Sequence, residues 1–216
     1  MRFCFALALT LAAFAIACSP LSAPPVFGPP QRDQALQPIL ANSDVQDGVR
    51  VDERAWLKTY SVSAQGGLAA VRRQLDRLGP ELDDTGQRFD GLTTWALRWT
   101  FSYDESRGGC AVRNGTIEVE AVITLPHLQD AEVLPAEEFN LWQGYQDKLR
   151  AHEDGHIDGY RTAAHDLRDQ VLNTGPMPDC AILTAVLNQQ GEAMIETIRY
   201  NDRLYDAATG HGAVFP

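Results

Sequence analysis

The residues with the clearest capacity for chemistry are two histidines four positions apart, with a glutamate directly after the first. His152, Glu153 and His156 stand in the stretch LRAHEDGHIDGY. On a helix these histidines lie one turn apart on the same face, with Cβ atoms about 6 Å apart, so both imidazoles can reach one tetrahedral ion. Glu153 lies about 100° around the helix, where it can take a proton from metal-bound water without binding the ion. The spacing predicts a zinc site with its own general base.

The helix that must position these residues is indicated by a long apolar stripe. From Pro135 to Val171, inward positions recur at steps of three or four, and they include Phe139, Trp142, Tyr145, Leu149, Tyr160, Ala163 and Leu167. His152 and His156 occupy positions on this stripe where buried residues are expected. Because unpaired buried polar groups are costly, a metal that binds both rings accounts for their placement.

A catalytic zinc site also needs a third protein ligand and an open position for water. His165 is excluded, because nine residues after His156 it lies on the opposite face of the helix, and Asp158 lies about 200° away. The stretch HEDGHIDGYRT resembles the metzincin motif as far as Gly159. The third metzincin histidine would fall at Thr162, which cannot replace it, so the ligand must come from another element.

Two sources for the third ligand remain open. His211 in ATGHGAVFP is flanked by glycines that let the backbone approach a site closely, and we rank it first. Glu192 or Glu196, on a second predicted helix, would copy the two-helix arrangement of thermolysin-like enzymes. A tyrosine could donate a hydrogen bond to a tetrahedral oxyanion. We favour Tyr205, the nearest to His211, over Tyr160 and Tyr200.

The remaining patterns predict one domain, residues 51–216, with an α+β fold. Its first half is expected to form a small antiparallel sheet and one helix. Its second half is expected to form two long helices that carry the zincin-like site. Strands are expected over 54–64, 91–103 and 110–127, with Asn114-Gly115 as a candidate tight turn. The first helix ends at Gly79-Pro80. The last helix is expected over 181–205, and the tail from Tyr205 is expected to be a loop.

The N-terminal residues predict export. Residues 1–17 combine Arg2, an apolar run too short to span a bilayer comfortably, and small residues before Cys18. The tail Ala15-Ile16-Ala17 fits signal-peptidase cleavage, but followed by Cys18 it also resembles a bacterial lipoprotein box, in which that cysteine is acylated. We favour a lipid anchor on Cys18 over a freely secreted or periplasmic form. Residues 18–50 are proline-rich and are interpreted as a tether.

Charge and cysteine content narrow the class of protein further. The net charge of −11 and the lack of a basic cluster argue against nucleic acid or anionic lipid as a ligand of the domain surface. Cleavage removes Cys4, and Cys18 is assigned to the lipid. Cys110 and Cys180 then remain as an even pair in an oxidising compartment, so we expect a disulfide between them.

Five segments in order along the chain, RFDGLTTW, GGC, LPHL, HEDGH and YDAATGHGAVFP, resemble the bacterial predicted secreted zinc-dependent protease family, otherwise a domain of unknown function. The resemblance covers the chain from about Arg54 to Pro216. It implies a zinc-dependent protease. It also supports His211 as a ligand, because the His-Gly near the C-terminus belongs to the shared pattern.

We therefore expect an exported, lipid-anchored zinc metallohydrolase, most simply a peptidase of the bacterial envelope acting on peptide or protein substrates. His152, His156 and His211 would hold Zn²⁺, and Glu153 would activate the water. The alternatives are a non-catalytic envelope lipoprotein with a structural zinc site and a zinc amidase acting on cell-wall peptides. Four protein ligands would favour the structural site, and three ligands with an accessible water position would favour the enzyme.

Overall fold

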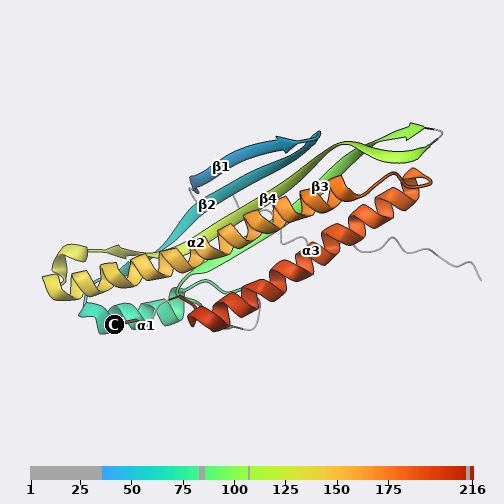
Figure 1. Cartoon of the computed structure of the whole chain (residues 1–216). Coiled ribbons are helices and arrows are strands. Elements are labelled where there is room, and N and C mark those ends of the chain that lie inside the picture. The colour runs from blue at the N-terminus through green and yellow to red at the C-terminus, as the bar shows by residue number, and fades with distance from the viewer. Residues whose placement is uncertain (1–35, 83–85, 107, 213–214) are drawn as a thin grey trace, which may run out of the picture.

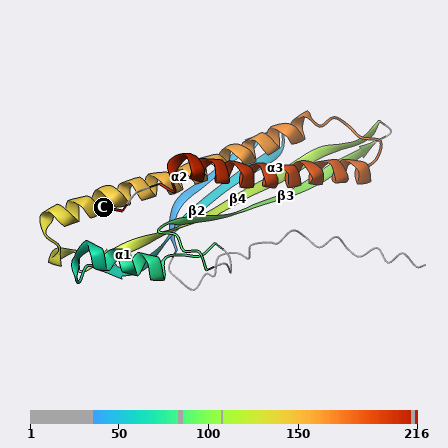
Figure 2. The same cartoon turned by 90° about the horizontal axis from the view of Figure 1, so that it is seen from below.

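A four-stranded sheet with two long helices lying side by side along it forms the framework of the molecule (Figures 1 and 2). The computed structural model describes residues 36–82, 86–106, 108–212 and 215–216. The elements are β1 (Gln37–Gln46), β2 (Val49–Ser63), α1 (Gly67–Leu78), β3 (Leu92–Ser106), β4 (Gly109–Gln129), the short 3₁₀ helix η1 (Ala131–Val133), α2 (Ala136–Asn173) and α3 (Cys180–Thr209). The expected α+β architecture is confirmed at this level.

The sheet is mixed, which corrects the expectation of an antiparallel sheet. The strand order is β1-β2-β4-β3, and the central pair β2–β4 is parallel from Val49↔Gly115 to Ser63↔Gln129. The two outer pairs are antiparallel. The long connection through α1 and β3 returns the chain beside β2 in the same direction, as parallel pairing requires. Strand alternation along the sequence carries no information about this direction.

The first strand extends the domain toward the N-terminus. Gln37–Gln46 pairs antiparallel with β2 through a two-residue hairpin, Asp47-Gly48, in which both residues have positive φ (48° and 82°). Asp-Gly is a preferred sequence for such a hairpin. Most side chains of β1 are exposed, so no alternation marks it as a strand. The predicted tether of residues 18–50 therefore overlaps the sheet, and the predicted signal, Cys18 and residues up to 35 lie outside the described residues.

Asn114-Gly115, a candidate turn in the sequence, lies inside the 21-residue strand β4. The expected turn is wrong for a steric reason. A Cβ atom on Gly115 would lie 2.3 Å from Cδ1 of Phe101 on β3, so the glycine makes room for a neighbouring aromatic ring. The strand continues through these residues, and its register with β3 shifts next to them, between Ser102↔Asn114 and Tyr103↔Val112.

The two long helices follow the predicted pattern, with one consequential difference at the end of α3. Helix α2 begins after Pro135 and buries His152, Glu153 and His156 along with its apolar stripe. Helix α3 begins after Asp179, whose side chain accepts a hydrogen bond from the Ile182 amide at 2.8 Å. It continues to Thr209, one turn beyond the predicted end, where Gly210 caps it with φ 60°.

The predicted disulfide is present in the structure. Cys110 and Cys180 are bonded across a sequence separation of 70 residues and join the start of β4 to the start of α3. The backbone of Cys110 also exchanges two hydrogen bonds with Met177, just before α3. The end of the sheet distant from α1 is thus tied to the connection between α2 and α3 (Figure 1). None of the described helices combines the length and apolar character needed to cross a membrane.

Replacing both Cys110 and Cys180 by serine should lower the free energy of unfolding by about 4 kcal/mol, because the unfolded chain regains the entropy of a closed loop of this length. Urea unfolding followed by circular dichroism measures the loss. Chemical reduction of the wild-type protein should lower stability by a similar amount. An unchanged unfolding midpoint would show that the bond does not constrain the chain.

Candidate metal centre

Three ligand atoms from two helices converge at the centre of the candidate site. His152 and His156 are 5% and 8% exposed on α2, and their Nε2 atoms are 3.2 Å apart. Oδ1 of Asp206, on α3, lies 3.1 Å from Nε2 of His152 and 3.0 Å from Nε2 of His156. These three residues form a cluster that could hold a metal ion, with all three ligand atoms within 4.8 Å of one another.

The hydrogen-bond partners of the Nδ1 atoms, which face away from the cluster, determine whether the Nε2 atoms carry a proton or a lone pair. Nδ1 of His156 lies 3.0 Å from Oδ1 of Asp202. An ionised carboxylate accepts hydrogen bonds and cannot donate one. Nδ1 of His152 lies 3.0 Å from the Thr209 hydroxyl, which already donates to the carbonyl of Tyr205. Both Nδ1 atoms therefore carry a proton, and both Nε2 atoms direct lone pairs at Asp206. Three such atoms repel one another unless a cation, either a proton or a metal ion, lies between them.

The separations suit a small tetrahedral ion. With zinc bonds of about 2.0–2.1 Å, the edge of the coordination tetrahedron is about 3.3 Å. The ligand atoms are 3.0, 3.1 and 3.2 Å apart, slightly closer. Two imidazole nitrogens and one carboxylate oxygen are also a donor set that zinc accepts. Asp202 and Thr209 hold the outer nitrogens, as partners of metal-binding histidines commonly do.

Asp206 was missed in the sequence because it follows Tyr205, where the tail was expected to become a loop. The additional turn of α3 places Asp206 opposite the histidine pair, four residues after Asp202, which lies within the predicted helix. That carboxylate spacing in NDRLYD was the available signal. It becomes meaningful only once α3 is known to continue and to pack against α2.

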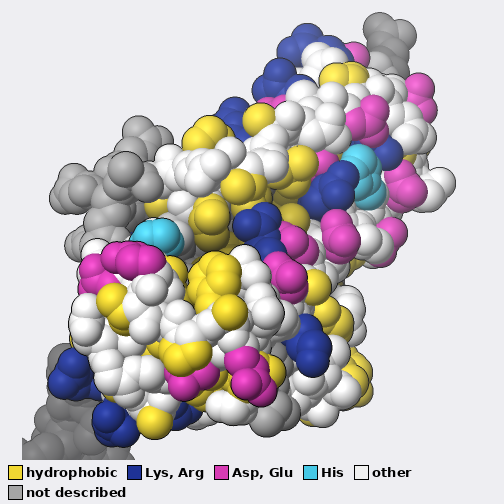
Figure 3. Space-filling view, turned by 90° about the vertical axis from the view of Figure 1, so that its left-hand side faces the viewer, with side chains coloured by type: hydrophobic (Ala, Val, Ile, Leu, Met, Phe, Trp, Pro, Cys, Tyr) yellow, Lys and Arg dark blue, Asp and Glu magenta, His cyan; other side chains and the backbone are white. Residues whose placement is uncertain are grey.

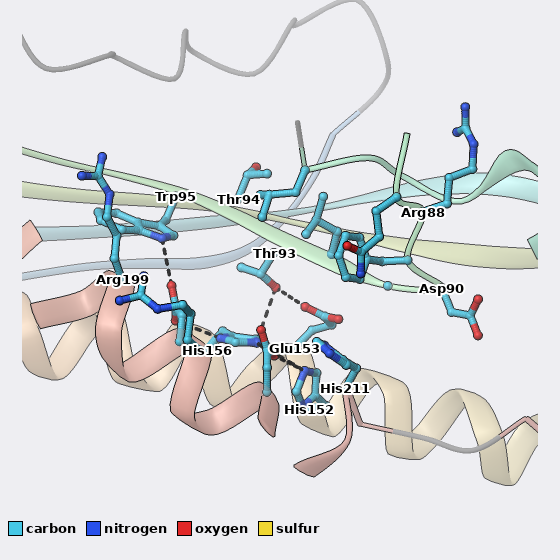
Figure 4. Close-up of a pocket in the computed structure, with 18 of the residues that line it drawn as sticks. Arg88, Asp90, Thr93, Thr94, Trp95, His152, Glu153, His156, Arg199 and His211 are labelled. Carbon is cyan, nitrogen blue, oxygen red and sulfur yellow. Dashed lines mark hydrogen bonds and ion pairs between the residues drawn. The ribbon is translucent and has the colours of Figure 1, made fainter. Parts of the chain in front are cut away.

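The residue ranked first as third ligand, His211, lies beside the three-residue cluster. Its Nδ1 atom is 3.7 Å from Oδ1 of Asp206, and its side chain is 58% exposed at the rim of the cleft. Figure 4 shows it next to His152. The two alternatives, Glu192 and Glu196, are exposed on α3 and do not line the cleft, and Glu196 pairs with Arg199 at 2.6 Å.

The tyrosines support the histidines. The Tyr205 ring stacks on His152, with centroids 4.9 Å apart at 11°, and meets His156 edge-on. Its hydroxyl packs on Gly155, where a Cβ atom would lie 2.1 Å from it, and the residue does not line the cleft. The Tyr160 hydroxyl donates to Asp202 at 3.2 Å, and Tyr200 is 55% exposed. Tyr205 therefore holds the two histidine rings in place. Its hydroxyl is not directed into the cleft, as the expected hydrogen bond to an oxyanion would require.

Glu153 is buried, at 3% exposure, and is held by the start of β3 (Figure 4). Its Oε2 atom accepts a hydrogen bond from the Thr93 hydroxyl at 2.7 Å. A Cβ atom on Gly91 would lie 2.7 Å from its Oε1 atom, so only glycine leaves room for the carboxylate there. Glu153 thus lines the cleft without belonging to the three-atom cluster.

Burial and neighbouring charges shift the pKa values of these groups. Burial raises the pKa of Glu153, and the hydrogen bond from Thr93 opposes this only in part. Burial, together with the nearby His156, lowers the pKa of His152. Burial also disfavours the charged form of His156, but the hydrogen bond to Asp202 and the negative charges of Asp202, Asp206 and Glu153 together outweigh it and raise the pKa. A neutral imidazole suits metal binding, and a glutamate with increased proton affinity suits proton transfer near neutral pH.

The segment RFDGLTTW supplies most of the remaining contacts of the site, although no chemical role was predicted for its residues. Asp90 accepts hydrogen bonds from Arg72 at 2.6 Å and from Tyr145 at 2.5 Å, which fixes the loop before β3. Trp95 donates to Oδ2 of Asp202 at 3.2 Å. Together with Gly91 and Thr93, these residues attach the beginning of β3 to both long helices.

An open cleft of about 600 Å³ gives access to the cluster. One side consists of residues 87–91 and the beginning of β3, and the other consists of α2 and α3. Strand β3 is an edge of the sheet, so its outer side pairs with no other strand among the described residues.

Comparison with known proteins gives one match. A family model described as a bacterial protein of unknown function, DUF922, matches residues 57–212, a range that contains all the site residues above. No curated protein and no solved structure matches the chain.

Replacing Gly91 by alanine should lower the free energy of unfolding by about 1–3 kcal/mol, because the added methyl group overlaps Glu153 and closely approaches Leu125 and Leu149. Urea unfolding measures the change. Gly144→Ala is the matched control: this exposed glycine of α2 has open space around it, so the same substitution should stabilise the protein by about 1 kcal/mol. Equal stability of Gly91→Ala and wild type would contradict the close packing of this site.

Proposed function

The chain belongs to the bacterial DUF922 family, and we propose that it is an exported zinc-dependent peptidase of the cell envelope. In this proposal His152, His156 and Asp206 bind the zinc ion and Glu153 is the general base. One observation carries it: the ligand atoms of two buried histidines and an aspartate converge within 3.2 Å on the floor of an open cleft, beside a buried glutamate.

The choice of zinc rests on the donor atoms and on their separations. Two nitrogens and one oxygen at the corners of a tetrahedral face leave a fourth corner for a small molecule, as in catalytic zinc sites. Hard ions such as magnesium and calcium prefer oxygen ligands throughout. Because the cleft is open beside the cluster, a substrate can reach that fourth position.

When bound, zinc supplies a Lewis acid that lowers the pKa of water and polarises a carbonyl group. Glu153 accepts the proton of the attacking water and then donates it to the leaving amine. Its raised pKa favours both directions of transfer near neutral pH, and Thr93 fixes the orientation of the carboxylate. Asp202 holds His156 in the tautomer that leaves Nε2 available.

A peptide is the substrate that the edge of the sheet suits best. The beginning of β3 lines the cleft and its outer side is unpaired among the described residues. An extended peptide can add to such an edge through backbone hydrogen bonds, with its side chains directed alternately to the two faces of the sheet. The scissile bond would then lie between β3 and the metal cluster.

A non-catalytic zinc site is the second candidate, and the position of His211 favours it. Nδ1 of His211 is 3.7 Å from Oδ1 of Asp206, so a small movement would bring a fourth protein ligand toward the ion. Four protein ligands would leave no position for water, as in structural zinc sites. The exposure of the ring, at 58%, supports the catalytic arrangement instead.

Glu153→Gln should lower the rate of peptide hydrolysis by a factor of about 10²–10⁴ while the zinc content stays at the wild-type level, because the amide cannot accept the proton. Mass spectrometry of a peptide library measures cleavage, and elemental analysis measures zinc. The control is Asp154→Asn at the next position, where the side chain bonds to Arg150 and to no other described residue. Wild-type cleavage by Glu153→Gln would exclude this mechanism.

Asp206→Ala should weaken zinc binding by more than about 100-fold, and Asp202→Asn by about 10–100-fold, since the first removes a ligand and the second only the partner of one. Competition with a chromogenic chelator measures both affinities. His211→Ala should keep wild-type affinity. If His211→Ala loses zinc and Asp206→Ala retains it, the third ligand is His211 and the assignment to Asp206 is wrong.

A further inference from the structure

The acidic side chains that line the cleft are all engaged by the protein. Asp90 is bound by Arg72 and Tyr145, and Glu153 by Thr93. Asp202 accepts hydrogen bonds from Trp95 and Tyr160 and contacts His156, and Asp206 contacts both site histidines. Their charges are directed toward the floor of the cleft, where a cation at the metal cluster would offset them further.

The basic side chains of the cleft lie on its rim. Arg88 and Arg199 stand toward opposite ends of the pocket in Figure 4. Arg203 follows Arg199 by one turn on α3, is exposed, and makes no hydrogen bond or ion pair with any described residue. Within the part of the chain that the structure describes, Arg199 pairs with Glu196 alone, whose side chain is 69% exposed, and such surface pairs are weak. Arg88 is already held by Glu81 and by the Gly79 carbonyl.

The charge of this rim is opposite in sign to the net charge of the protein. The chain carries a net charge of −11. On the end of the molecule seen in Figure 3, acidic and basic side chains are interspersed. Two adjacent arginines without a strong partner, at the mouth of a cleft, therefore attract anionic groups to a surface that otherwise repels them. Charge at the entrance of a cleft has a large effect because the cleft walls focus the field.

We propose that the cleft selects peptides with an acidic side chain, whose carboxylate binds Arg203 with Arg199 beside it. This inference rests on the proposed peptidase function and names its substrate class. A peptide lying along β3 has α3 on the opposite side of the cleft. Side chains of an added strand alternate between the two faces of the sheet, so those on the face along which α3 lies are directed toward the α3 rim (Figures 1 and 2). A guanidinium and a carboxylate can form two parallel hydrogen bonds, which makes the contact specific as well as strong.

The experiment uses peptides that differ only by Glu, Gln or Lys at each position around one scissile bond. Wild-type protein should cleave one Glu peptide with a kcat/KM about tenfold above its Gln counterpart, and the Lys peptide more slowly still. Arg203→Gln should bring the Glu/Gln ratio close to one, and Arg203→Glu should favour the Lys peptide. Arg73→Gln is the matched control, because Arg73 is exposed on α1, outside the cleft, and should leave the ratio unchanged.

Binding provides a second measurement that does not depend on hydrolysis. Fluorescence anisotropy of the labelled Glu and Gln peptides with Glu153→Gln protein should show the same preference, weakened by added salt and by Arg203→Gln. Cleavage without a charge preference would overturn this inference and leave the peptidase proposal standing. Selective binding without any cleavage by wild type would support the acidic ligand and overturn the peptidase. If the protein shows a charge preference neither in binding nor in cleavage, the inference is overturned.

Discussion

The contact between one turn of α2 and the last two turns of α3 is the constraint on which the site depends. Two histidines on the buried face of a helix need partners for four ring nitrogens, because unpaired buried polar groups are costly. Asp202 and Thr209 bind the outer nitrogens, and Asp206 faces the inner ones. All three partners belong to one stretch of α3. A shift of α3 by one turn relative to α2 would remove all of them together.

Three attachments spaced along α3 fix this relation. At its beginning, Cys180 is bonded to Cys110 of β4. Further along, Gly191 lies against the ring of Trp99 of β3, where no Cβ atom would fit. Near the end of the helix, Trp95 of β3 donates to Asp202. The helix is therefore held against the sheet along its length as well as against α2. A rigid support of this kind keeps ligand atoms at defined separations.

The same arrangement places a proton acceptor beside the cluster. Thr93 and Gly91 stand at the start of an edge strand, so they hold Glu153 while leaving the outer side of that strand open to the cleft. A metal site that served only to tie two helices together would have no need for a buried glutamate with raised pKa next to an accessible cavity. The engaged acids on the floor and the arginines on the rim give the two parts of the cleft opposite electrostatic character.

The sequence by itself determined the features that local spacing controls. Residues four apart share a helix face, so His152 and His156 were predicted to meet, and the even pair of remaining cysteines predicted the disulfide found in the structure. The tertiary structure alone decided the parallel pairing of β2 with β4 and the position of Asp206 beside the histidine pair. Periodicity indicates which face of an element is buried and not which distant element covers it. Here the element that covers the histidines is the final part of α3, which packs against α2 through contacts between residues about fifty positions apart.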